Sequence, residues 1–309
     1  MPQAPSPLRG TLWLALAVFS WAGLFPLAKR TLPVLDAFAL GSARYALGIV
    51  LFVAILWVAE GARALRYGAR LVPACVFGVV GFCGFNLLVW WGLVYTRPEH
   101  AAIILSLQSA LTALALWLVR GLRPARFTLG CVGVAIAGVL VVVTEGDPAA
   151  LLAGGSLVGD LLVFLGALSW VAYSLSGPLF AGWSPLRMTV LTAIPGTVGL
   201  IAIHALAIAA GWSQAPSLEE LLSVKWQLAY FAVFTVVLGV LGFNNGVRHL
   251  GALNAMLTLN LIPVIVFAIE AALGRSFSML EIAGATLVIG ALAANNLYLR
   301  ARAAENADA

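Results

Sequence analysis

Residues 10–22 read GTLWLALAVFSWA, and residues 159–171 read GDLLVFLGALSWV. Both segments are apolar, begin with glycine and carry a Ser-Trp pair near the end, at a constant offset of 149 residues. A single Ser-Trp pair in Trp-rich apolar sequence would be a weak signal, but here the pair and the preceding glycine recur together. We therefore expect the second half of the chain to repeat the first.

Other recurrences extend this repeat. Gly-Phe-Asn stands at residues 84–86 and again at 242–244, with an offset of 158 that makes the match weaker. Amides recur as Gln108 and Asn260, and glycines as Gly138 and Gly290, both with an offset of 152. We expect two structural repeats, residues 1–146 and residues 147–309.

The composition is that of a membrane protein. Apolar residues make up 62% of the 309 positions and charged residues 9%, and the mean hydropathy is +1.04. Because soluble domains are about a quarter charged, this chain cannot cover a water-facing surface. A span needs about 20 apolar residues, so we predict an all-α protein of ten transmembrane helices, at roughly 10–29, 34–59, 71–95, 99–119, 127–143, 155–179, 188–210, 226–247, 251–273 and 279–299.

Five helices in each half is an odd number, so the second repeat should run upside down relative to the first. Inverted repeats place a substrate site near the middle of the membrane, at the repeat interface, and exchange between two packings opens it to either side. The inverted repeat therefore indicates a transport function. In the longest gap, Ser217 and Glu220 form a capping-box pattern that predicts a short helix.

The positive charges predict an orientation, because Lys and Arg gather in cytoplasmic loops. The set of helix ends that includes both termini carries Arg9, Arg63, Arg66, Arg70, Arg120, Arg123, Arg126, Arg187, Arg248, Arg300 and Arg302. The other set carries Lys29, Arg30, Arg97, Lys225 and Arg275. We expect a multi-pass protein of a bacterial-type inner membrane with both termini in the cytoplasm. Since these charges stand singly at helix ends, the net charge of +5 does not indicate nucleic-acid binding.

In these features the chain resembles the drug/metabolite transporter superfamily, specifically the EamA family, over nearly its whole length. The resemblance rests on Ser20-Trp21-Ala-Gly with Lys29, on Arg44-Tyr45, on Gly159-Asp160-Leu-Leu…Ser169-Trp170, and on Ala255…Asn260-Leu-Ile-Pro263. Within the family it is most similar to YddG-type exporters of aromatic amino acids. The resemblance implies two inverted five-helix repeats and a cavity lined by helices 1–4 and 6–9, with helices 5 and 10 peripheral.

Two departures from the family pattern stand out. Many relatives carry a proline in the middle of helix 4, where this chain has Gln108 to Ala110. Many also carry a glutamate after the glycine that ends helices 4 and 9, where this chain has Leu122 and Arg275. Roles that those family residues play do not carry over to these positions.

Arg44 is the sharpest single signal, because an arginine in mid-span costs roughly 2.5–3.5 kcal/mol on insertion scales. It either binds a substrate carboxylate with its guanidinium or bonds to neighbouring helices. Glu270 either carries a proton or a cationic substrate, or simply reaches water or Arg275 at its helix end. Asp160 and Glu281 stand at helix starts, where the helix dipole favours acidic residues.

Neutral polar and aromatic side chains at mid-span predict the site itself. Amides at this depth must bond to each other, to a ligand or to water, because lipid offers no partner. Tryptophans this central either pack helices or stack on a substrate. We predict one cavity lined by Trp21, Asn86, Trp90, Gln108, Ser169, Trp170, Tyr173 and Asn260, with Arg44 beside it.

The function that these features predict is export of small amphipathic metabolites, most of all aromatic or hydrophobic amino acids, by alternating access. We expect no enzymatic activity, cofactor or metal, and a homodimer is compatible with the chain but not required. One alternative is an exporter of lipophilic organic cations or drugs, which needs a central carboxylate. Another is an intramembrane lipid-modifying enzyme, which needs clustered carboxylates or histidines at one interface.

Overall fold

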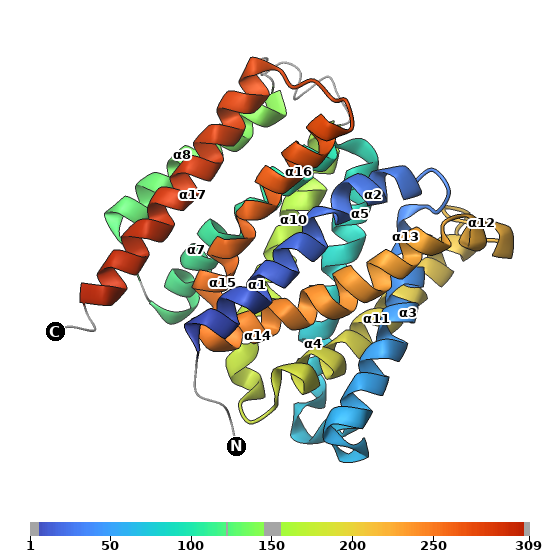
Figure 1. The fold of residues 1–309 in the computed structure, drawn as a ribbon. Coiled ribbons are helices and arrows are strands. Elements are labelled where there is room, and N and C mark those ends of the chain that lie inside the picture. Colours follow the sequence, from blue (N-terminus) through green and yellow to red (C-terminus); the bar gives the residue numbers. More distant parts are fainter. Residues whose placement is uncertain (1–5, 122, 145–155, 306–309) are drawn as a thin grey trace.

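The computed structural model describes residues 6–121, 123–144 and 156–305, and every regular element within these ranges is helical (Figure 1). Eight helices there are long and apolar enough to span a membrane, and two shorter apolar helices, Arg126–Val142 and Met279–Asn295, accompany them. Nine of the expected spans coincide with these segments to within about four residues at each end, and the expected span 71–95 forms the later part of the longer segment Ala62–Tyr95. The prediction of an all-helical membrane protein is confirmed. The expected boundary between the halves, at residues 146 and 147, lies outside the described residues.

The described part of the first half contains eleven helical elements, several of which continue one another within a single span. In chain order they are α1 (Pro7–Ala22), α2 (Leu24–Thr31), α3 (Ala37–Glu60), the 3₁₀ turns η1 (Ala62–Leu65) and η2 (Gly68–Arg70), α4 (Leu71–Gly78), the π-helix η3 (Val79–Gly84), α5 (Phe85–Tyr95), α6 (Pro98–Ser106), α7 (Gln108–Arg120) and α8 (Arg126–Thr144).

The second half follows the same plan. Its elements are α10 (Ser156–Leu175), the 3₁₀ turn η4 (Gly177–Phe180), α11 (Pro185–Ala209), α12 (Leu218–Ser223), α13 (Lys225–Tyr230), the π-helix η5 (Phe231–Gly239), α14 (Val240–Leu250), α15 (Ala252–Leu259), α16 (Leu261–Ala272) and α17 (Met279–Glu305). The predicted short helix is α12, and its capping box between Ser217 and Glu220 is present.

Three spans are broken near their centres. The breaks fall at Gly23 between α1 and α2, at Leu107 between α6 and α7, and at Asn260 between α15 and α16. At each break ψ lies near −10°, which tightens the turn and interrupts the α-helical hydrogen bonds. The break at Leu107 forms without a proline, because residues 104–110 contain none. Broken helices leave free backbone ends that serve binding sites in transporters.

Helix pairing recurs between the halves. α5 packs against α10, and α1 packs against α14, so the first helix of each half lies along the third span of the other half. α3 pairs with α11, and α8 pairs with α17 at the edge of the molecule (Figure 1). These reciprocal contacts are those expected of two structural repeats, and α8 and α17 are as peripheral as the resemblance implied.

Glycines allow the closest of these approaches. A Cβ atom at Gly92 would lie 2.6 Å from the carbonyl oxygen of Gly159, so α5 and α10 meet backbone to backbone. In the α8–α17 pair, a Cβ atom at Gly138 would lie 2.8 Å from the oxygen of Gly284. Gly138 and Gly284 therefore form the close contact between α8 and α17. Close approach matters because packing, not hydrophobic burial, drives helix association in lipid.

Candidate functional site

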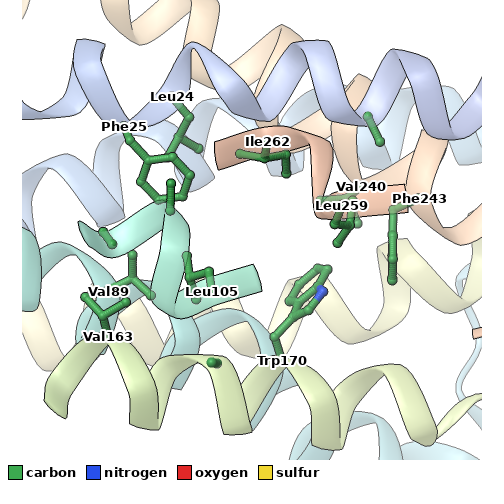
Figure 2. Packing of buried hydrophobic residues seen from close by; sticks show 14 of the residues in the cluster. Leu24, Phe25, Val89, Leu105, Val163, Trp170, Val240, Phe243, Leu259 and Ile262 are labelled. Carbon is green, nitrogen blue, oxygen red and sulfur yellow. The ribbon is translucent and has the colours of Figure 1, made fainter. Parts of the chain in front are cut away.

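A cavity of about 60 Å³ lies between the two halves. Its wall includes five of the nine predicted site residues, namely Trp21, Arg44, Trp90, Gln108 and Trp170. Figure 2 shows apolar parts of the same wall, with Phe25, Leu105 and Trp170 coming from different helices. The volume holds only a few water molecules, so a metabolite requires the helices to move apart.

Among the described residues that line this cavity, Arg44 on α3 is the only charged one, and its side chain is buried. Its Nη2 donates to Oδ1 of Asn86 at 2.6 Å, and its Nη1 donates weakly to Oγ1 of Thr235 at 3.4 Å. Its guanidinium lies 4.6 Å from the centre of the Trp90 ring, a cation–π contact. Within the described chain, no carboxylate lies within 4.0 Å of it, and its Nε has no hydrogen-bond partner. The cavity therefore contains a positive charge without an anionic partner.

Asn86 orients this guanidinium from behind. Its Oδ1 also accepts a hydrogen bond from Nε1 of Trp90 at 3.1 Å, and its own Nδ2 donates to the carbonyl of Phe82 at 2.6 Å. With every polar atom of the amide engaged, Asn86 is fully buried and does not reach the cavity surface. It supports the site instead of lining it.

Aromatic rings close one end of the cavity. Trp21 and Trp170 meet edge to face with centroids 5.8 Å apart, and Phe243 packs against both, at 5.7 Å and 5.6 Å. Nε1 of Trp21 donates to the carbonyl of Thr235 at 2.9 Å, which fixes the ring. The two central tryptophans of the repeated Ser-Trp motif thus lie in direct contact.

The amide side chains at the α6–α7 and α15–α16 breaks, Gln108 and Asn260, lie in different places. Gln108 lines the cavity next to the C-terminal end of α6. Asn260 is buried behind the wall, where its Nδ2 donates to Oγ of Ser109 at 3.4 Å and its Oδ1 has no partner. Asn260 therefore connects the two breaks and is not among the lining residues.

Ser169 and Tyr173 also lie away from the central cavity. Oγ of Ser169 donates to the carbonyl of Leu165 at 3.1 Å, and the side chain faces Gly84 on the neighbouring span. Tyr173 is fully buried, and its hydroxyl accepts a hydrogen bond from Nδ2 of Asn244 at 3.2 Å. The shared depth of these residues in the sequence did not determine which way they face.

A second cavity of about 550 Å³ opens beyond the aromatic barrier, toward the start of α11 and the end of α14. Phe243 and Asn244 form its inner wall, and Phe180, Trp183, Met188 and Arg248 lie around it. Nδ2 of Asn244 also donates to Oγ1 of Thr189 at 2.5 Å. Sequence reasoning missed Asn244 as a site residue, although the repeated Gly-Phe-Asn motif marks it.

Charged groups at the opposite end form a separate network. Glu99 pairs with Arg275, while Glu281 accepts from Arg97 at 3.0 Å and from Arg275 at 2.8 Å. His100 lies beside Glu281, and donor atoms of Glu99, His100 and Glu281 fall within 4.8 Å of one another. Two guanidinium groups already balance the two carboxylates, which disfavours a bound cation. Burial lowers the pKa of Arg275, the member of this network that stands between α16 and α17. Arg275 thus pairs with these residues, and not with Glu270.

Broken helices around a mid-span cavity, closed by aromatic rings, define a membrane carrier. The EamA-like transporter family model matches residues 8–144 and again residues 157–297. The chain belongs to the EamA-like transporter family, and the family part of the sequence prediction is confirmed.

Individual relatives agree with this assignment. The chain is 32% identical over 288 residues to the uncharacterized transporter YyaM of Bacillus subtilis, covering 92% of each chain. It is 28% identical over 295 residues to the uncharacterized transporter YrdR of the same organism, covering 94% of this chain and 92% of that one. A crystal structure that is 21% identical has the same fold, with a TM-score of 0.68 over 96% of this chain and 99% of that chain.

Proposed function

We propose that this transporter exports small amphipathic carboxylates, with aromatic and hydrophobic amino acids as the favoured class, by alternating access. The observation that carries the proposal is the guanidinium of Arg44, which is held by Asn86 and Thr235 but has no carboxylate partner among the described residues, in a cavity walled by aromatic and apolar side chains. A planar guanidinium can hold both oxygens of a carboxylate, and Trp21, Trp90 and Trp170 offer faces for an apolar side chain.

The ammonium group of an amino acid also has a place in this cavity. α6 ends at Ser106, and Leu105, Ser106 and Gln108 all line the wall. The C-terminal end of a helix carries partial negative charge, and broken helices present such ends to ions and substrates in carriers. A zwitterion can therefore bind between Arg44 and the end of α6 without a fixed carboxylate.

Counterflow tests this substrate class. Purified protein in liposomes loaded with unlabelled phenylalanine should take up labelled phenylalanine faster than empty liposomes. Phenylpropionate keeps the ring and the carboxylate and should compete, whereas phenethylamine and tetraphenylphosphonium lack the carboxylate and should not. Counterflow of tetraphenylphosphonium but not of phenylalanine would support the lipophilic-cation alternative. That alternative is disfavoured because the charged side chain found in the described cavity wall, Arg44, is positive.

The lipid-modifying enzyme needs clustered carboxylates or histidines at one interface, and Glu99, His100 and Glu281 do form such a cluster. It is disfavoured because Arg97 and Arg275 already pair with the two carboxylates.

We also propose the orientation: ten spans in two inverted repeats, residues 1–146 and 147–309, in an inner membrane with both termini cytoplasmic. Gln214 and Arg66 are exposed beyond opposite ends of α3. In a variant lacking the native cysteines, Gln214→Cys should react in intact cells with a thiol reagent that does not cross membranes. Arg66→Cys should react only after the cells are opened, and the reverse pattern would overturn the orientation.

A further inference from the structure

Asp160 on α10 is a buried carboxyl group that the cavity does not use. Its side chain is 6% exposed, and its Oδ1 accepts one hydrogen bond, from Oγ1 of Thr96 at 2.6 Å. Its Oδ2 is buried without a hydrogen-bond partner. Asp36 at the start of α3 shows the contrast, because its carboxylate accepts from Phe38 N, Ala39 N and Oγ of Ser213. Asp36 is satisfied as an anion, whereas Asp160 is not.

The basic groups around Asp160 are engaged elsewhere. Lys29 on α2 donates to the backbone carbonyls of Leu93 and Thr96, at 2.7 Å and 2.9 Å. Arg97, at the N-cap of α6, is near enough to attract the Asp160 charge, but it is half exposed and pairs with Glu281. The first turn of α6 adds Glu99 and His100, which belong to the network with Arg275 and Glu281. Over the residues that the structure describes, no basic nitrogen lies within 4.0 Å of Asp160.

The position of Asp160 joins the two halves of the chain. Thr96 caps α5, which carries Trp90, and Asp160 lies on α10, which carries Trp170. The bond between Thr96 and Asp160 closes the same contact at which Gly92 and Gly159 meet. Since the halves must move relative to each other for the cavity to change sides, this contact has to change as well.

We propose that Asp160 is a proton-binding site whose protonation state controls the opening of this end of the transporter. A carboxyl group that is buried with one hydrogen bond favours its neutral form, whereas a hydrated one favours the anion. The closed state therefore binds the proton more tightly than the open state does. By linkage, raising the pH shifts the population toward the open end, and lowering the pH holds it closed. The proposal rests on the proposed transport function for its consequence, but proton binding itself requires no substrate.

The first experiment measures opening without a substrate. Spin labels at Val94 on α5 and Leu161 on α10, both exposed, report the separation of the two helices in purified protein. From about pH 5 to about pH 8, a range above the ordinary aspartate pKa of roughly 3.9, the distance distribution should shift to longer values. Asp160→Asn should keep the short distance throughout, and Asp36→Asn, the matched control, should follow the unmodified protein.

Other outcomes overturn the proposal. No pH-dependent shift in the unmodified protein, or the same shift in Asp160→Asn, would remove Asp160 as the controlling group. If Asp160→Asn does not fold, Thr96→Val serves instead. This change removes the only hydrogen bond to the anion, so the midpoint should move to higher pH, and an unchanged midpoint would count against the proposal.

The second experiment joins the switch to transport. In right-side-out and inverted membrane vesicles, phenylalanine counterflow should depend on the pH of the compartment that Asp160 faces, and Asp160→Asn should abolish that dependence. Absence of counterflow at every pH would contradict the proposed function, while the spin-label result would still decide the proton site. Counterflow with the same pH dependence in both proteins would contradict only the proton site.

Discussion

Asn86 and Asn244 end the two copies of the Gly-Phe-Asn motif, but they have different neighbours. The Oδ1 atom of Asn86 accepts from a guanidinium and an indole, Arg44 and Trp90. The Nδ2 atom of Asn244 donates to two hydroxyl groups, those of Tyr173 and Thr189. Asn86 is fully buried behind a narrow cavity, whereas Asn244 is half-buried in the wall of the larger one.

The difference separates two tasks. Under the proposed function, Arg44 beside Asn86 binds the substrate carboxylate, whereas Asn244 itself has only uncharged partners and the charged residue of the second cavity, Arg248, is a different part of its wall. A carrier needs both charged and uncharged contacts, because a substrate that is held by charge at every point of its route would not be released. We therefore propose that the Arg44 side selects the substrate and that the Asn244 side serves its passage.

The largest effect is expected at Arg44. Arg44→Gln should lower the competition by phenylpropionate against phenylalanine counterflow by about 10- to 100-fold, since hydrogen bonds to charged groups contribute about 1.5–3 kcal/mol. Arg44→Lys should recover only part of this, because an ammonium cannot hold both carboxylate oxygens. Arg248→Gln, in the wall of the second cavity, is the matched control and should change competition little. Equal losses for Arg44→Gln and Arg248→Gln would break the comparison.

A smaller effect is expected when each amide is replaced by leucine. Asn86→Leu leaves donors of Arg44 and Trp90 without their acceptor, which should lower stability by about 1–3 kcal/mol. Asn244→Leu should cost less, because the hydroxyl of Thr189 already donates to the carbonyl of Pro185 at 2.7 Å. Thermal unfolding of the two purified variants, followed by tryptophan fluorescence, gives the order. Equal destabilisation of the two variants would mean that the different hydrogen-bond partners of Asn86 and Asn244 do not contribute differently to stability.

The smallest effect is expected at the barrier between the cavities. Phe243→Ala removes the ring that packs on Trp21 and Trp170, and such contacts contribute about 0.5–1.5 kcal/mol beyond burial. Efflux of labelled phenylalanine into substrate-free buffer should therefore rise in this variant. Phe180→Ala, which lines only the second cavity, should leave efflux unchanged. A rise in both variants would indicate general loosening instead of a lost barrier.

Much of the fold followed from the sequence because lipid imposes simple rules. Span length, the absence of charge and the Ser-Trp repeat are properties of single segments, so the helices and the family could be predicted from them. The predicted site residues Trp21, Arg44 and Trp170 do line the cavity, because they lie at one depth on helices that face the centre of the bundle.

The remaining predicted site residues show that depth in the membrane does not determine the direction in which a side chain points. Ser169 is next to Trp170 in sequence, but successive residues on a helix point about 100° apart, so Ser169 faces Gly84 instead. Tyr173 is one turn beyond Trp170 on the same face, where its ring packs against Trp170 and Phe82 and does not line the cavity.

The π-helical segments η3 and η5 change the directions in which Asn86 and Asn244 point. No residue pattern predicted these segments. From the sequence, Asp160 is an ordinary acidic residue near a helix start. Whether other spans supply it with hydrogen-bond donors or basic groups is decided only by the tertiary structure.

The π-helices η3 and η5 have one more consequence. A π turn contains one more residue than an α turn. It therefore rotates the side chains that follow it about the helix axis. If η3 returned to α-helical winding, Phe85 and Asn86 would swing by about 100°, the angle that one residue occupies. The same change in η5 would turn Phe243 and Asn244. The two states of this carrier can then differ by winding as well as by tilting, and we expect a structure open to the other side to show altered turns in these two segments.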